Sequence, residues 1–92
     1  MRISVRRTGG FGGIARRAEL ETAEGEFAAL VRTALAEGRA ERPIGVPDGF
    51  HYEIEAEGTA RHCADPRLTD AQQTVVARVL KEGRQLPVDR RP

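Results

Sequence analysis

The chain has 92 residues, a length that supports one hydrophobic core and therefore one domain. Fifteen basic and fourteen acidic side chains give a formal net charge of +1, which argues against a dedicated nucleic-acid-binding protein, because such proteins neutralise many phosphates. The N-terminus has no apolar signal segment, and no stretch approaches the roughly 18 apolar residues of a membrane span. We therefore expect a cytoplasmic protein that contacts no membrane. We also expect the protein to be monomeric when free.

The first predicted element is a β-hairpin over residues 1–21. Apolar residues occupy every second position from Met1 to Val5, which is the period of a half-buried strand, and a similar alternation resumes after a glycine-rich stretch. The register that pairs Ile3 with Leu20 also brings four arginines together at the loop end of the hairpin: Arg6 opposite Arg17 and Arg7 opposite Arg16. Since like charges on paired strands are destabilising, this arginine collar indicates a functional role.

The glycine-rich stretch between the two strands, TGGFGGIARR, holds one of only three phenylalanines in the chain. The residues that we single out are Gly9, Gly10, Phe11, Gly12 and Gly13. Glycines let a backbone approach a partner closely, and an isolated aromatic ring can fill a pocket on that partner. Phosphate-binding loops normally lead into a helix N-terminus, whereas this one leads into a strand. We interpret it as an inserting loop, and the alternative is a plain connection between strands.

An amphipathic helix is predicted next, because apolar residues recur at steps of three and four. Its buried face is formed by Phe27, Leu30, Val31, Ala34 and Leu35. Thr22 is placed to cap the N-terminus of this helix, and Gly38 to follow its C-terminus. Prolines and glycines between Arg39 and Gly49 then indicate a loop.

The clearest strand pattern follows, in GFHYEIEAEG, and Gly58 marks a hairpin turn into a second strand, TARHCAD. The inward face of the first strand is predicted to carry Phe50, Tyr52, Ile54 and Ala56. A two-residue turn would place Arg61 opposite Ile54 on the core face. We therefore expect a three-residue connection that places Arg61 opposite Glu55.

The last helix is predicted to begin at a capping box formed by Thr69 and Gln72, and to end at Gly83. Its buried stripe is formed by Val75, Val76, Val79 and Leu80. The element order ββαββα predicts an α+β fold, with a four-stranded antiparallel sheet and two helices packed on one face. Residues 1–86 form this single domain, and residues 87–92 are a short polar C-terminal tail.

Residue types offer little for metal binding or catalysis. Cys63 is the only cysteine, so no intrachain disulfide can form. In the expected register His51 and Cys63 face outward while His62 faces inward, so the three do not form a zinc site. No serine or cysteine has a base beside it, and the glutamates that follow His51 form a solvated row: Glu53, Glu55 and Glu57. We therefore expect no enzyme activity, no metal and no cofactor.

Two blocks of the sequence, ISVRRTGGFGGIARRAEL and PDGFHYEIEAEG, have a counterpart in a known family. The first resembles a strand, a GGFaG loop and a strand with arginines, and the second resembles a PD-x-F-x-Y-x-[ILV] strand. In this order, with a helix after each block, the chain resembles the emfourin family of small protein inhibitors of thermolysin-like zinc metalloproteases. The similarity covers essentially the whole chain. Gly12 stands where the family commonly has alanine, which makes the loop looser and raises the cost of ordering it.

The resemblance implies an intracellular, tight-binding inhibitor of a thermolysin-like protease. On this basis we expect the glycine loop to occlude the active-site cleft, with Phe11 in the apolar pocket beyond the scissile bond. The arginine collar would lie at the rim and steer association. A mechanism in which Cys63 ligates the protease zinc is disfavoured, because Cys63 lies within a predicted strand. The alternative function is a regulatory or adaptor module that binds an acidic protein partner through the arginine collar.

Overall fold

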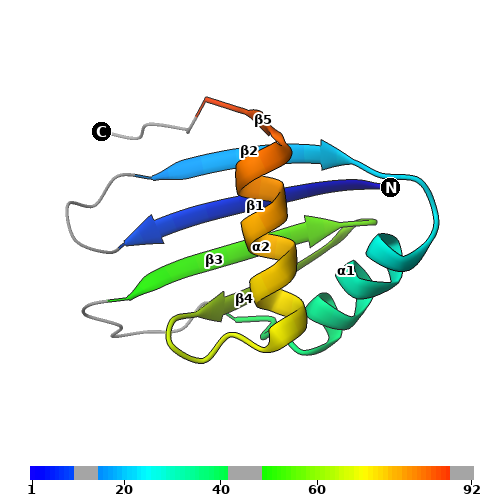
Figure 1. Ribbon diagram of the computed structural model, residues 1–92. Coiled ribbons are helices and arrows are strands. Elements are labelled where there is room, and N and C mark those ends of the chain that lie inside the picture. Colours follow the sequence, from blue (N-terminus) through cyan, green and yellow to red (C-terminus); the bar gives the residue numbers. More distant parts are fainter. Residues whose placement is uncertain (10–14, 42–48, 88–92) are drawn as a thin grey trace.

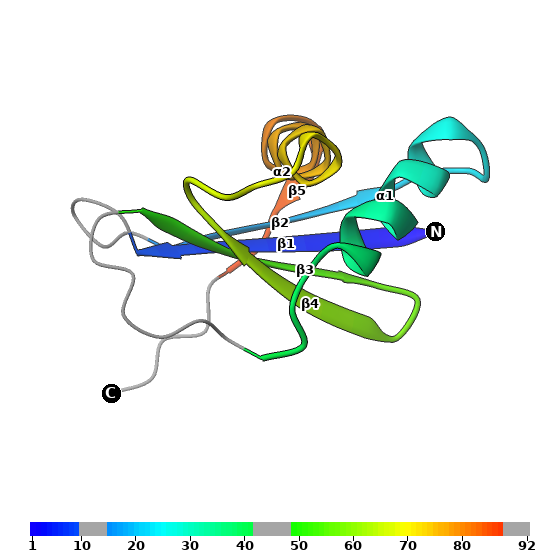
Figure 2. The same ribbon diagram turned by 90° about the horizontal axis from the view of Figure 1, so that it is seen from below.

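A computed structural model describes residues 1–9, 15–41 and 49–87. The elements in these ranges are β1 (Arg2–Gly9), β2 (Arg16–Glu21), α1 (Glu26–Ala36), β3 (Phe50–Ala56), β4 (Thr59–Ala64), α2 (Asp70–Glu82) and β5 (Arg84–Gln85). The strands form one antiparallel sheet in the order β4-β3-β1-β2-β5, and both helices cover the same face of it (Figure 1 and Figure 2). The α+β class is confirmed, but the sheet has five strands where four were predicted.

The additional strand, β5, extends the sheet beside β2. It pairs Ala18 with Gln85 and Glu19 with Arg84. Gly83 permits the chain to turn from α2 onto β2, because a Cβ atom there would lie only 2.7 Å from the Glu19 carbonyl oxygen. The segment is short and polar and so has no hydrophobic period to indicate a strand. Residues 88–92 of the predicted tail lie outside the described residues.

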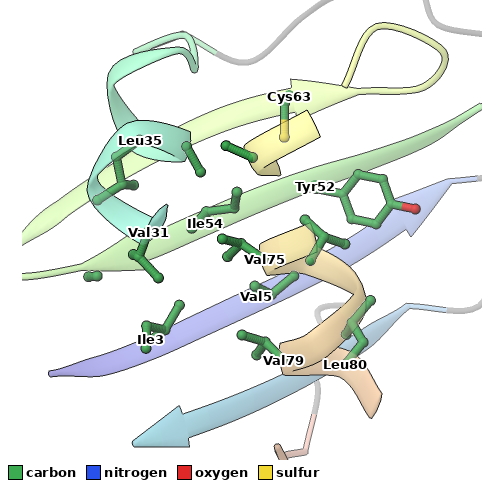
Figure 3. Packing of buried hydrophobic residues seen from close by; sticks show 14 of the residues in the cluster. Ile3, Val5, Val31, Leu35, Tyr52, Ile54, Cys63, Val75, Val79 and Leu80 are labelled. Atoms are coloured by element: carbon green, nitrogen blue, oxygen red, sulfur yellow. The ribbon is translucent and has the colours of Figure 1, made fainter. Parts of the chain in front are cut away.

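The core lies between the sheet and the two helices (Figure 3). It contains residues from the predicted inward faces: Ile3, Val5, Ala18, Val31, Ala34, Leu35, Tyr52, Ile54, Ala56, Val75, Val76, Val79 and Leu80. Phe27, Leu30 and Phe50 pack against this cluster and are half-buried. Fully burying a side chain such as Ile3 contributes on the order of 1.5–3 kcal/mol, so the alternating pattern of β1 strongly favours the observed register.

Gln72 joins the two helices and is 2% exposed. The predicted capping box at the start of α2 is confirmed: the Thr69 main-chain nitrogen donates to the Gln72 side chain, and the Gln72 main-chain nitrogen donates to the Thr69 hydroxyl. The Gln72 amide also donates to the Ala34 carbonyl, 3.2 Å away in α1. A residue predicted to cap one helix therefore also orients the other helix.

The N-cap predicted for α1 is wrong, since Gly25 occupies that position and provides no side-chain cap. Thr22 directly follows β2, and its main-chain nitrogen donates to the Met1 carbonyl while its own carbonyl accepts from the terminal amino group. This pairing with Met1 keeps Thr22 outside the helix. At the other end, Gly38 follows the C-cap residue Glu37, in agreement with the prediction.

The connection between β3 and β4 also differs from the expectation. It is a two-residue turn of Glu57 and Gly58, with φ angles of 53° and 75°, and Ile54 lies opposite Arg61. Two residues with positive φ form the tight turn whose twist matches that of paired strands. Arg61 tolerates its inward position because β4 is the last strand of the sheet, and its guanidinium donates to the Ala60 carbonyl, 2.9 Å away.

In the ranges that the structure describes, no helix has both the length and the apolar character needed to cross a membrane.

Candidate functional site

The predicted inserting loop connects β1 to β2 at the end of the sheet where β3 begins (Figure 1). Its central residues, Gly10, Phe11, Gly12 and Gly13, lie outside the described residues. Gly9 is described: it ends β1 with a φ of +82°, a conformation that other residues rarely adopt. A Cβ atom on Gly9 would lie 3.1 Å from the Gly49 carbonyl oxygen. The chain therefore enters the loop through a position that requires glycine, close to the start of β3.

The arginine collar has the predicted register, with Arg6 opposite Arg17 and Arg7 opposite Arg16. Neighbouring residues of a strand point to opposite faces, so the two pairs separate. Arg7 and Arg16 lie on the face covered by the helices, whereas Arg6 and Arg17 lie on the face without helices. The arginine collar is therefore divided into two pairs with different surroundings, Arg7 with Arg16 and Arg6 with Arg17.

Arg7 and Arg16 are half-buried beside α2. Arg16 Nη2 donates to the Leu80 carbonyl at 2.8 Å and to Gln85 Oε1 at 3.3 Å. The Arg7 guanidinium carbon lies 4.3 Å from the centre of the Phe50 ring, a cation–π contact. The Nε atoms of Arg7 and Arg6 are buried and have no hydrogen-bond partner among residues 1–9, 15–41 and 49–87.

An open recess of about 630 Å³ lies beside this pair, and we name it the helix-face recess. Its lining residues are Arg7, Arg16, Tyr52, Ala77, Leu80, Lys81 and Gln85. Three of these are cations, and no carboxylate from the described part of the chain lines the recess. Figure 3 shows the Tyr52 hydroxyl pointing away from Ile54 and the other core side chains. Burial, with a smaller effect of Asp65, raises the pKa of Tyr52, so this hydroxyl keeps its proton at neutral pH.

The opposite pair has a balanced environment. Arg6 and Arg17 share a recess of about 240 Å³ with Ser4, Glu53 and Glu55. Arg6 lies opposite Glu53 across β1 and β3, and Arg17 Nε donates to Ser4 Oγ over 3.5 Å. Two carboxylates therefore offset the two guanidinium groups on the helix-free face.

The two histidines lie together on the helix-free face, which corrects the prediction that His62 faces inward. His51 Nε2 and His62 Nδ1 are 3.0 Å apart, and the rings are stacked with their centres 5.0 Å apart. Thr8 Oγ1 lies 3.3 Å from His51 Nδ1, and Glu53 Oε2 lies 3.9 Å from His62 Nε2. The two-residue turn causes the difference, because it moves His62 opposite Glu53.

Cys63 moves inward for the same reason, so the prediction that it faces outward is wrong. It lies opposite Tyr52 and is 7% exposed. Burial, together with the nearby Asp65, raises the pKa of the Cys63 thiol to about 11. The thiolate needed to ligate zinc is therefore disfavoured at neutral pH. Within the described ranges, no group of three or more histidine, cysteine, aspartate or glutamate side chains is placed to hold a metal ion.

Comparison with protein-family models gave one finding that covers most of the chain. The model named Emfourin matches residues 5–80, a range that begins within β1, includes β2, α1, β3 and β4, and ends near the C-terminus of α2. The comparisons with curated proteins and with solved structures gave no match. The matched range contains the glycine loop, the arginine collar and the strand after residue 49, so the resemblance seen in the two sequence blocks is confirmed. The chain belongs to the Emfourin family, and this membership suggests a role as a protease inhibitor.

Proposed function

We propose that the domain inhibits a thermolysin-like zinc metalloprotease, and that the loop between β1 and β2 occludes the active-site cleft. The observation that carries this proposal is the membership of an inhibitor family together with the geometry at Gly9. Gly9, the last residue of β1, has a positive φ and stands where the glycine-rich stretch of the sequence begins. In Figure 1, α2 crosses the middle of the sheet, and the ends of β1 and β2 next to the loop extend past it.

The sheet supplies a rigid support for such a loop. β1 lies between β2 and β3 in the sheet, so hydrogen-bonded strands flank it on both sides. A rigid support lowers the entropy lost when a loop is ordered on a partner. Phe11 would fill the apolar pocket beside the scissile bond, and the small neighbours would let the main chain lie along the cleft.

Occlusion of the cleft, rather than extraction of the metal, follows from the residue types. Residues 9–13 contain no histidine, cysteine or carboxylate, so only main-chain carbonyl groups could approach the zinc. Cys63 cannot replace them, because it is buried under the helices on the core side of β4. The protease would thus keep its zinc in the complex.

The direct test is inhibition of purified thermolysin-like proteases, measured with a fluorogenic peptide. We expect potent inhibition by the natural chain and a loss of about 2 kcal/mol of binding free energy, or roughly thirtyfold in the inhibition constant, for Phe11→Ala. Phe27→Leu is a matched control, since Phe27 packs against the core beside α2 and lies far from the loop in sequence. Unchanged hydrolysis across several such proteases would contradict the proposal.

The alternative is an adaptor that binds an acidic protein through the arginine collar without affecting proteolysis. The observation in its favour is the positive charge of the helix-face recess. An adaptor of this kind would lose binding when Arg7 and Arg16 are replaced by glutamine, and would be indifferent to Phe11→Ala. The two variants therefore separate the two functions in one binding assay.

A further inference from the structure

We propose that the helix-face recess binds a carboxylate group from an acidic segment of the inhibited protease, next to the cleft that the loop enters. This inference rests on the proposed inhibitory function. It adds a second contact region for the protease, defined by Arg7, Arg16 and Lys81. Arg6 and Arg17, on the opposite face, are not part of this region.

The charge distribution of the recess is the first argument. Arg7 and Arg16 lie directly opposite each other on β1 and β2, and Lys81 adds a third cation from the last turn of α2. Like charges at facing positions destabilise a sheet, and no carboxylate in the described part of the chain lines this recess. A carboxylate from a partner would remove the repulsion between the two guanidinium groups.

The second argument is that both guanidinium groups are already held in place. Arg16 is fixed by the Leu80 carbonyl and by Gln85, and Arg7 is fixed over the Phe50 ring. Neither of these contacts neutralises the positive charge. Arginine side chains that are ordered before binding lose less entropy when they form paired hydrogen bonds with a carboxylate. The Arg7 Nε is buried and has no hydrogen-bond partner among the described residues, so this guanidinium group is not fully satisfied within the described part of the chain.

The lining of the recess strengthens these interactions. Ala77 and Leu80 contribute apolar side chains to the lining beside the three cations, and a less polar surrounding increases the attraction between opposite charges. The helix-free recess is a contrast inside the same molecule, since Glu53 and Glu55 line it together with Arg6 and Arg17. Electrostatic attraction of an acidic partner is therefore expected on the helix face and not on the opposite face.

The location of the recess indicates which partner it serves. Arg7 precedes Gly9 by two residues, and Arg16 is the first residue of β2, so both arginines lie at the roots of the loop. A protease that receives Phe11 in its cleft would bring its rim against these positions. The volume of about 630 Å³ and the open shape leave room for a carboxylate side chain with its main chain.

Lys81 provides the most specific test, because its exposed side chain forms no hydrogen bond or ion pair with the described residues. We expect Lys81→Glu to raise the inhibition constant of a thermolysin-like protease roughly tenfold at low salt, and less at high salt. Arg67→Glu is the matched control: Arg67 is exposed, lies outside the recess and gives the same change in net charge. Its inhibition constant should change less than about twofold. Equal losses in the two variants would overturn the proposal.

A binding measurement without a protease separates this inference from the proposed function. Titration with a hexaglutamate peptide, followed by NMR, should shift the signals of Arg7, Arg16 and Lys81 in a saturable way, and Lys81→Glu should reduce the shifts. If the chain inhibits the protease but shows no such shifts, and if Lys81→Glu and Arg67→Glu weaken inhibition equally, the recess does not bind a carboxylate and the inhibitory function still stands. Saturable shifts in a chain that inhibits no protease contradict the inhibitory function and leave an acidic-peptide site. Stronger shifts with inorganic phosphate than with the peptide would overturn the assignment to an acidic polypeptide.

Discussion

Arg16 Nη2 donates a hydrogen bond to the main-chain carbonyl of Leu80, 2.8 Å away, and thereby joins β2 to the last turn of α2. Gln85 supports the contact, because its amide donates to the same carbonyl at 3.0 Å. The last carbonyl groups of a helix have no partner within the helix, and a cation close to them also interacts favourably with the helix dipole. Arg16 is therefore needed for the fold as well as for the helix-face recess.

Replacement of Arg16 by alanine should lower the free energy of unfolding by about 1–2 kcal/mol, since it removes a charge-assisted hydrogen bond to a helix terminus. Arg17→Ala is the matched control on the opposite face, where the side chain shares a recess with Glu53 and Glu55 and its hydrogen bond to Ser4 is long, at 3.5 Å. We expect that variant to change stability by less than about 0.5 kcal/mol. Urea denaturation at neutral pH measures both values, and equal losses would show that the contact with Leu80 contributes nothing.

Gly9 and Gly58 form a second matched pair, because both have a positive φ, of 82° and 75°. Alanine at either position should lower the free energy of unfolding by about 1–2 kcal/mol, the usual penalty for a Cβ atom in the left-handed conformation. Only Gly9→Ala should also weaken protease inhibition, since it changes the direction in which the chain enters the loop. Gly58 lies in the turn between β3 and β4, and a Cβ atom there would meet no atom within 4 Å.

Thermal denaturation and inhibition assays on the two glycine variants measure these effects. If both variants inhibit as strongly as the natural chain does, the conformation at Gly9 has no role in presenting the loop.

Arg32, within α1, links Glu24, which precedes the helix, to Glu57 in the turn between β3 and β4. Its guanidinium lies 2.8 Å from a carboxylate oxygen of Glu24 and 2.9 Å from one of Glu57. Hydrogen bonding to Arg32 lowers the pKa of both glutamates below the ordinary value of 4.5. Because these pKa values are lower in the folded state, the stabilisation is complete above pH 4.5 and is lost as the pH falls through the lowered values.

Arg32→Gln should therefore reduce the melting temperature at neutral pH, and the difference from the natural chain should shrink as the pH falls below 4.5 and both carboxylates become protonated. Arg78→Gln serves as a comparison, since its ion pair with Glu82 lies within a single helix turn. A difference for Arg32→Gln that persists unchanged in acid would indicate that packing of the arginine stem, and not its charge, stabilises this corner of the fold.

Cys63 should react slowly with thiol reagents in the folded protein. Its pKa of about 11 leaves very little thiolate at pH 8, and the side chain is buried. We expect the reaction with a disulfide reagent to accelerate by orders of magnitude in urea. Fast reaction of the folded chain would contradict the inward position of Cys63.

The raised pKa of Cys63 also predicts a loss of stability in alkali. The folded-state pKa is higher than the ordinary value of 9.0, so the stabilisation is complete below pH 9.0 and disappears as the pH rises through about 11. Cys63→Ala should make the melting temperature less sensitive to pH in this range. Equal sensitivity of the two chains would contradict burial of the thiol.

Elements whose signals are local could be predicted from the order of the residues. Alternation in residues 1–21 was sufficient for the register of β1 with β2, because a slip by one residue would expose Ile3 and Val5. The capping box at Thr69 and the apolar stripe of α2 were equally clear. The opposed arginine pairs followed from the same register, and the two sequence blocks were sufficient to identify the family.

Features that depend on contacts between distant segments became visible only in the folded structure. The length of the β3–β4 turn, and with it the faces of His62 and Cys63, depends on whether an edge strand can accommodate Arg61. Likewise, β5 exists because β2 has an edge to which residues 84–85 can add. The difference between the two arginine pairs also required the structure. The face of the sheet on which a residue lies follows from the alternation of its sequence neighbours. The surroundings of Arg16 instead depend on Lys81 and on the Leu80 carbonyl, which approach it only when α2 packs on the sheet.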